Sequence, residues 1–236
     1  MSIRGGAARH GGSGADPRRR GTGGTTVAEL EILGIPQSNF VWACRLAAAE
    51  KGVPHSLLPL MPHAPEVKAI NPTGKVPAMR HGAVTLGESR AICGYIDAAF
   101  DGPRLIPADT AKAALVEQWA SIVNTVVEPV CVRQYLMGYF FPGTPDGSPN
   151  RAVIDPAIPK MQDQLRMLDQ AVAATGFLAG DAFSLADVFL VPNLVYLSRA
   201  PESGALLKEL PALSAYLDRM LSRPTVQATI PPPIPT

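Results

Sequence analysis

The chain has 236 residues, of which 47% are hydrophobic and 17% are charged, and its formal net charge is +1 at pH 7. This composition is typical of a globular protein of one or two domains, and it excludes a chain that is disordered over most of its length. No segment approaches the roughly 20 apolar residues that a membrane helix needs, and the slightly acidic body offers no basic surface for nucleic acid. The three cysteines form no CxxC pair, which excludes a disulfide scaffold or a zinc module and favours a reducing, cytoplasmic compartment.

The first 26 residues differ from the rest of the chain. Residues 1–26 contain eight glycines and five arginines, with a single acidic residue and almost no large apolar ones. Such a segment cannot bury enough apolar surface to offset the entropy lost on ordering, so we expect a disordered tail. The alternatives are a targeting peptide, an arginine arm for nucleic acid, or a start codon placed too far upstream. A secretory signal is disfavoured because the segment has no apolar core.

Residues 27–104 alternate between strand and helix patterns, which predicts a small α/β domain. Apolar alternation predicts the strands, and apolar residues at helical spacing between capping residues predict the helices. The expected strands are 28–34, 55–60, 76–80 and 83–86. The expected helices are 40–51, 65–70 and 88–100. The elements therefore follow one another as βαβ, a short helix, and ββα.

Strand patterns stop after a linker at 101–107, and residues 110–230 are expected to form an all-helical domain. The expected helices are 110–137, 155–175, 184–199 and 206–221. Pro129 is expected to kink or end the first of them, because proline has no N–H and its ring clashes with the preceding turn. The C-terminal residues 230–236 are rich in proline, so we expect them to be extended and to have no catalytic part.

Four local features occur in a particular order and spacing. They are Pro36-Gln37-Ser38, the run NPTGKVPAM at 71–79, the pair Glu88-Ser89, and FLAGDAFSLADVFLVPNLVYL at 177–197. Over about 200 residues the chain resembles the cytosolic glutathione transferases, and within them the serine-type, phi-like branch. The resemblance implies a thioredoxin-like N-terminal domain followed by a helical-bundle C-terminal domain. It also implies glutathione as co-substrate, no metal, and a homodimer.

Ser38 is the candidate catalytic residue. A thiol with the ordinary cysteine pKa of ~8.5 is mostly protonated at pH 7, and only the thiolate is a good nucleophile. A serine hydroxyl that donates a hydrogen bond to sulfur at a helix N-terminus favours the thiolate. The alternative is that Ser38 only caps its helix, which contributes about 1 kcal/mol of stability. Asn39 is a second candidate, because its amide could also donate to sulfur.

The Val76-Pro77 step is the candidate backbone partner of glutathione. Cis peptide bonds are almost confined to X-Pro, and a cis Pro77 would turn the backbone of Val76 outward as a free edge. A short peptide such as glutathione could pair with that edge as an added strand. The alternative is a proline that merely ends a loop.

Further glutathione contacts are implied by the resemblance. Glu88 and Ser89 open a helix whose free N–H groups favour an anion, so Ser89 would hold the γ-glutamyl carboxylate and Glu88 the amino group. Ordinary helix capping is the alternative role of this pair. Lys75 matches the basic or amide position before Val-Pro, and His63 falls near the histidine of the short second helix. The loop around His63 is shorter than in the family pattern, and a solvated loop histidine is the alternative there.

The second substrate is expected between the two domains, where the first long C-terminal helix faces Ser38. Trp119, Val123, Tyr135 and Tyr139 have the apolar or aromatic character that such a pocket needs. The alternative for each of them is a place in the core. The sequence does not identify the electrophile.

Ser184 and Asp187 form an S-x-x-D capping box at the start of a helix, which indicates a folding element and not a catalytic acid.

The three cysteines, Cys44, Cys93 and Cys131, are interpreted as small buried apolar residues, because the position where some superfamily members carry a cysteine holds Ser38. Trp42 resembles part of the pattern of the maleylacetoacetate isomerase branch, but the serine and cysteine of that pattern are missing.

These observations predict an enzyme that transfers glutathione to a small hydrophobic electrophile through a thiolate stabilised by Ser38. Etherase, dehalogenase, isomerase or peroxidase activity would use the same glutathione site with a different helical pocket. A non-catalytic ligand-binding protein of the same fold would be expected to have a damaged glutathione site. A thiol-disulfide oxidoreductase that acts through Cys44 would keep its reactivity in Ser38→Ala.

Overall fold

A computed structural model describes residues 29–233 of the chain. Its N-terminal part is built on a four-stranded mixed sheet with the order β2-β1-β3-β4. The strands are β1 (Leu30–Leu33), β2 (His55–Leu58), β3 (Ala78–His81) and β4 (Val84–Gly87). β2 runs parallel to β1, whereas β3 is antiparallel to both β1 and β4. The tail expected over residues 1–26 lies outside the described residues.

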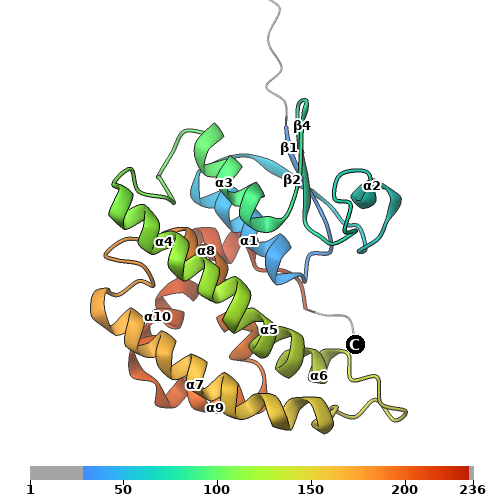
Figure 1. The fold of residues 1–236 in the computed structure, drawn as a ribbon, viewed down its shortest axis with the longest axis vertical. Helices are drawn as coiled ribbons and strands as arrows, with labels where there is room; N and C mark the ends of the chain where they lie inside the picture. The colour runs from blue at the N-terminus through green and yellow to red at the C-terminus, as the bar shows by residue number, and fades with distance from the viewer. Residues whose placement is uncertain (1–28, 234–236) are drawn as a thin grey trace, which may run out of the picture.

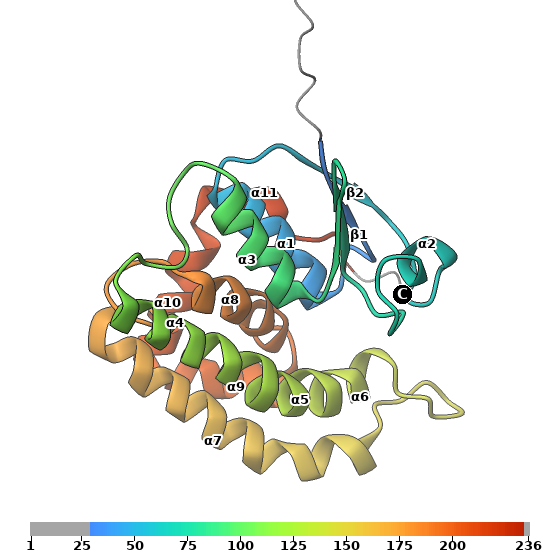
Figure 2. The same ribbon diagram turned by 45° about the horizontal axis from the view of Figure 1, so that its top comes forward.

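Three helices accompany the sheet, as expected. They are α1 (Asn39–Glu50), α2 (Pro65–Lys68) and α3 (Ser89–Ala99). α1 and α3 pack against each other on one face of the sheet, and the short α2 lies on the other side (Figures 1 and 2). The element order βαβαββα gives a thioredoxin-like domain, which confirms the predicted fold class for this part of the chain.

The elements that follow α3 are all helices, which confirms the predicted all-helical fold of the second part of the chain. The helical segments are α4 (Thr110–Ile122), η1 (Val123–Val127), α5 (Glu128–Val130), η2 (Cys131–Leu136), α6 (Met137–Phe140), α7 (Arg151–Thr175), α8 (Leu185–Leu197), α9 (Pro201–Glu209), α10 (Pro211–Leu221) and α11 (Pro224–Thr229). No helix in the span 29–233 is both long enough and apolar enough to cross a membrane.

Two expectations about these helices need correction. Pro129 was expected to kink or end its helix; it does not end it, since the helix continues from α4 to α6, but its regular winding is interrupted by the π-helical segments η1 and η2 on either side of the proline. The helix expected at 206–221 is two helices, since α9 ends at Glu209 and Pro211 begins α10. α11, which the sequence patterns did not predict, follows Arg223.

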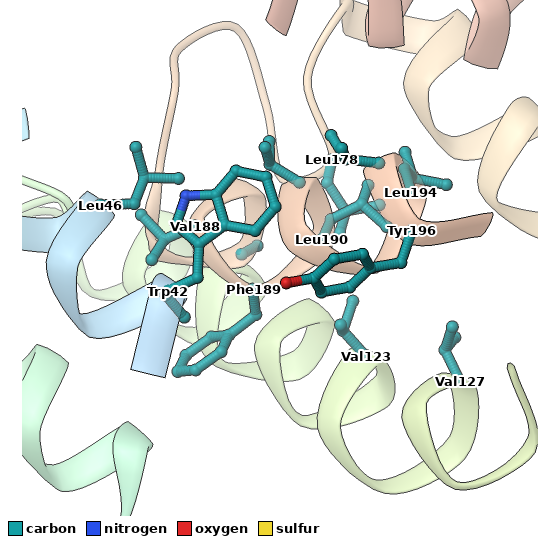
Figure 3. Close-up of a cluster of buried hydrophobic side chains, with 14 of the residues drawn as sticks. Trp42, Leu46, Val123, Val127, Leu178, Val188, Phe189, Leu190, Leu194 and Tyr196 are labelled. Atoms are coloured by element: carbon teal, nitrogen blue, oxygen red, sulfur yellow. The ribbon is translucent and has the colours of Figure 1, made fainter. Parts of the chain in front are cut away.

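The main core lies where α1 crosses α8 and α4. Every residue of α8 is buried, because this helix runs through the centre of the helical domain. Figure 3 shows Trp42 and Leu46 of α1 beside Val188 of α8, with Val123 on the opposite side of the cluster. Removing such large apolar side chains from water contributes about 1.5–3 kcal/mol each. The shared core therefore fixes how the helical domain sits against the α/β domain.

The C-terminal helix α11 is fastened to α1. The indole Nε1 of Trp42 donates to Thr229 Oγ1 over 3.0 Å, and Arg45 Nη1 donates to the Thr229 carbonyl over 3.1 Å. Arg223 binds the carboxylate of Glu50 through Nε and Nη2, both at 2.6 Å. The residues of α11 and its N-cap are therefore structural partners of the helix that begins at the candidate site.

The capping box predicted at α8 is present, and the carboxylate of Asp187 is its centre. Asp187 is fully buried and accepts hydrogen bonds from the Ser184 backbone N–H at 2.9 Å and from the Ser184 hydroxyl at 3.0 Å. It also accepts from the Leu178 N–H at 3.0 Å and from the Tyr216 hydroxyl at 2.9 Å. Four donors thus converge on one carboxylate in the interior, which is a structural arrangement.

The three cysteines are free thiols and all are buried, as interpreted from the sequence. Cys44 of α1 and Cys93 of α3 lie with their Sγ atoms 3.8 Å apart. Burial raises the pKa of the Cys44 thiol well above its ordinary value, and burial raises that of Cys131 to about 12. The thiols of Cys44 and Cys131 are therefore held in the unreactive protonated form.

Candidate functional site

The sheet register brings three separate segments to one edge. Leu33, the last residue of β1, pairs with Ala78, the first residue of β3, and Ala78 pairs with Gly87, the last residue of β4. The chain that follows β1, the chain that precedes β3 and the chain that follows β4 therefore emerge side by side. These segments carry Ser38, the Val76-Pro77 step and the Glu88-Ser89 pair. These three segments are separated along the chain, but they are neighbours in space.

Ser38 occupies the N-cap of α1. Its Oγ accepts a hydrogen bond of 3.4 Å from the Val41 N–H, and its carbonyl accepts from the Trp42 N–H at 2.9 Å. The residue is half-buried, and within the described part of the chain its hydroxyl hydrogen is not donated to a protein acceptor. Ser38 therefore caps the helix and still has a proton to donate to a ligand.

Asn39 is placed differently from Ser38. Its side chain is buried, and Nδ2 donates to Asn193 Oδ1 of α8 over 3.1 Å. The same side chain lies near Glu128: burial raises the pKa of that carboxyl above its ordinary value, and the nearby Arg133 and Asn39 act in the opposite direction. Asn39 joins the two domains, which leaves its amide less available to a ligand than the Ser38 hydroxyl.

The Val76-Pro77 peptide bond is cis, as expected. The chain passes close to this step, because a Cβ on Gly34 would lie 2.9 Å from Val76 Cβ and 2.5 Å from Val41 Cγ2. Only glycine allows this approach, and Gly34 also has a positive φ of 150°. β3 begins at Ala78, so Val76 lies outside the ladder that joins the strands.

The loop before Pro77 is held by Asn71. Its Nδ2 donates to the Lys75 carbonyl over 3.0 Å, while its Oδ1 accepts from the Thr73 N–H at 3.1 Å. The His63 N–H donates to the Gly74 carbonyl at 2.7 Å, and the imidazole of His63 covers the α-carbon of Gly74. The structure thus brings His63 next to the loop that carries Lys75, although His63 lies at the start of a separate segment.

Glu88 and Ser89 stand at the start of α3. Glu88 is exposed and has a positive φ of 67°, a backbone conformation that is rare for a residue with a side chain. Such strain clusters at sites where ligands bind. Ser89 is buried beneath it, and its carbonyl lies 3.8 Å from the Cys44 sulfur on α1.

The helix from α4 to α6 runs beneath the α/β domain and forms the other side of the site (Figures 1 and 2). On one face of it, Glu117 accepts a hydrogen bond of 3.0 Å from Arg90 Nε next to Ser89, and Glu128 lies against Asn39 next to Ser38. Ser121 and Asn124 fall on the same face at helical spacing. The wall that faces the candidate glutathione site is therefore polar.

The expected apolar pocket residues are located elsewhere. Val123 and Tyr135 have 0% of their surface exposed, and Val123 belongs to the core cluster of Figure 3. The Tyr135 hydroxyl donates to Glu202 Oε2 at 2.9 Å, and the Tyr139 hydroxyl donates to the same oxygen at 2.5 Å. The two tyrosines tie the helix to α9 through Glu202, and the side chains of Val123 and Tyr135 lie in the core, where they line no opening. Trp119 is only partly buried, but it lies on the outer face of α4, away from Glu117.

Comparison with known proteins identifies the family. Residues 33–104 match the model of the glutathione S-transferase N-terminal domain, and residues 151–219 match that of the C-terminal domain. The chain is 31% identical over 224 residues to glutathione S-transferase 3 of Zea mays, a match that covers 88% of this chain and 98% of that protein. The chain belongs to the glutathione S-transferase family. Its curated relatives in this family include glutathione S-transferase F13 of Arabidopsis thaliana, which is 30% identical over 83% of this chain and 92% of that protein.

Solved structures of the family have the same fold as this member. Glutathione transferase F7 from Populus trichocarpa superposes with a TM-score of 0.77 at 28% identity, covering 85% of this chain and 97% of that one. Glutathione S-transferase I from maize also gives a TM-score of 0.77, at 27% identity over 86% of this chain and 97% of the maize chain, and that structure is a complex with an atrazine glutathione conjugate. The resemblance to the phi-like branch that the sequence motifs suggested is confirmed, because these relatives are plant phi-class glutathione transferases.

Several side chains that shape the site had no clear signal in the sequence. Asn71 precedes a proline, and that pattern predicts only a turn. Asn193 falls in an almost wholly apolar helix, where a single amide indicates a buried hydrogen bond without naming its partner. Between residues 29 and 233 the structure holds no cluster of three or more His, Cys, Asp or Glu side chains that could bind a metal ion.

Proposed function

We propose that this family member is a glutathione transferase that activates glutathione through Ser38. The observation that supports it is the convergence of the Ser38 hydroxyl, the cis Val76-Pro77 step and the start of α3 at one edge of the sheet. The Val76 backbone would pair with the cysteinyl part of glutathione. Ser89 and the free N–H groups of α3 would hold the γ-glutamyl carboxylate.

The remaining contacts follow from the positions of the side chains around this edge. Glu88 is exposed above Ser89 and would meet the γ-glutamyl amino group. Lys75 is exposed beside Pro77, and with His63 it would hold the glycine carboxylate at the other end of the tripeptide. Placed in this way, glutathione would direct its sulfur toward the start of α1.

The chemical role of Ser38 is to favour the thiolate. Lowering the thiol pKa by about two units requires roughly 2.7 kcal/mol of preferential interaction with the anion. A hydrogen bond to a charged acceptor contributes about 1.5–3 kcal/mol, and the helix N-terminus adds about 0.3–1 kcal/mol. The two together are sufficient. The enzyme then holds an electrophile beside the thiolate, and this orientation accounts for much of the rate.

The test is a pH titration of bound glutathione, followed by thiolate absorbance, in the wild type, Ser38→Ala and Ser38→Thr. We expect a bound thiol pKa well below that of free glutathione in the wild type, loss of the shift in Ser38→Ala, and retention of most of it in Ser38→Thr. If glutathione binds and its thiol titrates normally, the protein is a ligand carrier and the catalytic role of Ser38 is wrong. If glutathione does not bind, the whole site assignment fails.

We further propose two domains, 27–104 and 110–230, and a cytoplasmic homodimer. An apolar stripe on the outer face of α4 and the following segment η1 supports the dimer: Leu115 is 39% exposed, Val126 is 47% exposed, and Trp119 and Ile122 lie between them. Such a stripe is costly in a monomer. Sedimentation of the wild type and of Val126→Asp tests this, and a wild type that sediments as a monomer contradicts it.

A further inference from the structure

Arg133 and Glu128 form an ion pair that depends on the unusual winding of their helix. Arg133 Nε lies 2.7 Å from Glu128 Oε1, although the two residues are five positions apart. In a regular α-helix such residues point about 140° apart, because each residue turns the helix by about 100°. Glu128 begins α5, and Arg133 lies in the π-helical segment η2 that follows Pro129, where the wider i to i+5 winding turns each residue by a smaller angle and brings Arg133 back toward Glu128. π-helical turns of this kind are frequent at functional sites.

The pair leaves the guanidinium of Arg133 oriented toward solvent at the start of α1. The Arg133 side chain is 52% exposed and that of Glu128 only 5%, so a buried carboxylate holds an exposed cation. Cζ of Arg133 lies 5.9 Å from the centroid of the Phe40 ring, so the guanidinium has a second neighbour on α1. Phe40 is two residues after Ser38.

The terminal nitrogens of Arg133 remain available. Glu128 contacts Nε, and it is the only carboxylate paired with Arg133 across residues 29–233. A planar guanidinium presents its two terminal N–H groups as a fork that matches a carboxylate. Because the fork is already oriented by Glu128 and Phe40, a ligand that binds it loses less conformational freedom than with a free arginine.

We propose that Arg133 is a specificity-determining residue that binds a carboxylate on the electrophile, so that the preferred acceptors are anionic. This inference rests on the proposed glutathione transfer at Ser38. It explains why the wall opposite Ser38 is polar, with Asn124 and Glu128 on its face, where an apolar pocket was expected. Glu128 and Phe40 are positioning residues, because they act through Arg133.

The reaction to be measured is aromatic substitution on a chlorodinitrobenzoate. The glutathione thiolate forms the C–S bond, the C–Cl bond breaks, and chloride leaves with the bonding electron pair. The thiol proton has already passed to solvent. The methyl ester of the same compound is the matched acceptor, since it has the same reacting carbon and no negative charge.

The assay compares kcat/KM for the acid and for its methyl ester in the wild type, Arg133→Gln and Arg133→Lys. We expect the ratio of acid to ester to fall about tenfold in Arg133→Gln, mainly through a higher KM for the acid, and to recover in part in Arg133→Lys. Arg166→Gln is the control, because Arg166 is an equally exposed arginine of α7 that pairs with Asp163. An unchanged ratio in Arg133→Gln overturns the proposal and makes the Glu128 pair purely structural.

Glu128→Gln and Phe40→Leu test the positioning. Both keep Arg133 but release its side chain, so the ratio of acid to ester should fall by a smaller factor than in Arg133→Gln. If either variant lowers both rates equally, with the ratio unchanged, that residue supports the fold and does not orient Arg133.

A binding measurement separates this proposal from the proposed function. Calorimetry with the two preformed glutathione conjugates, carboxylate and methyl ester, requires no turnover. Weaker binding of the carboxylate conjugate alone in Arg133→Gln supports the proposal even if Ser38 proves not to be catalytic. Equal binding of both conjugates to wild type and variant refutes it, and binding of neither conjugate refutes the glutathione site as well.

Discussion

The carboxylate of Asp187 offers the sharpest test of how the helical domain is held together. Its two oxygens accept hydrogen bonds from different donors. Oδ1 accepts from the Leu178 N–H and the Tyr216 hydroxyl, and Oδ2 accepts from the N–H and the hydroxyl of Ser184. Each oxygen therefore satisfies one backbone N–H, which cannot turn away, and one hydroxyl, which can. All of these groups are buried, so a lost acceptor is not replaced by water.

This division predicts different costs for two substitutions. In Asp187→Asn an NH2 group replaces one of the two carboxylate oxygens and therefore faces either the Leu178 N–H or the Ser184 N–H. An NH2 group cannot accept a hydrogen bond. The neighbouring hydroxyl can rotate to accept from it, but the backbone N–H is left unsatisfied. One buried unsatisfied donor costs about 2 kcal/mol. Asp187→Ala leaves both backbone donors unsatisfied and adds a small cavity, so it should cost about 4 kcal/mol or more.

The assay is urea-induced unfolding at a fixed chain concentration, read by tryptophan fluorescence and circular dichroism. Ser184→Ala should cost about 1 kcal/mol, as expected for loss of a capping hydroxyl. Asp181→Asn, at an exposed carboxylate just before the same helix, is the control and should change the free energy of unfolding by less than about 0.5 kcal/mol. Equal stability of Asp187→Asn and wild type would refute the reasoning, because it would mean that one oxygen suffices.

Three further predictions concern the site and its supports. Gly74→Ala should weaken glutathione binding about tenfold in equilibrium titration, because the φ of residue 74 is +69° and the new Cβ meets the His63 imidazole. Adding His63→Ala removes the collision but leaves the backbone strain at residue 74. Complete recovery of binding in the double variant would therefore contradict this prediction. Thr229→Val should lower the free energy of unfolding by about 1–2 kcal/mol, since it leaves the buried Trp42 N–H without an acceptor, whereas Thr229→Ser should be close to wild type. Burial acts to raise the pKa of Glu202, but hydrogen bonds from its tyrosine and arginine neighbours hold it at about 2. A carboxyl whose folded pKa is lowered contributes stability above its ordinary pKa and loses it as the pH falls toward the folded value. In Glu202→Gln the fall in the free energy of unfolding on acidification should therefore be smaller by about 1 kcal/mol, a figure reduced for solvent screening. A fall equal to that of the wild type contradicts the prediction.

The sequence was a good guide wherever short-range rules apply. The strands and helices of the α/β domain follow from alternation, capping and turn residues, and the capping box at Ser184 predicts the start of α8 to the residue. The edge that gathers Ser38, Pro77 and Ser89 could be inferred only through the resemblance to a known family. No local pattern in the sequence sets the register that makes these segments neighbours.

The faces of the helix from α4 to α6 could not be predicted from spacing alone. Apolar character suggested that Val123 and Tyr135 line a pocket, but large apolar side chains are also the ones most often buried in a core, and both residues are buried there. Pro129 breaks the regular 3.6-residue period, and beyond it any projection based on an α-helix points residues in the wrong direction. Arg133 would then be placed away from Glu128, which the structure shows to be its partner.

The burial of the thiols has a consequence for a protein that is proposed to handle electrophiles. A protein that handles electrophiles is exposed to alkylation by them, and cysteine is the side chain most easily attacked. Here Cys44, Cys93 and Cys131 are enclosed, and the pKa values of Cys44 and Cys131 are raised by burial, so the chain itself offers little thiolate. Under the proposed function, the only reactive sulfur at the site arrives with glutathione and leaves with the product. The nucleophile is replaced at every turnover, and the catalyst is not consumed.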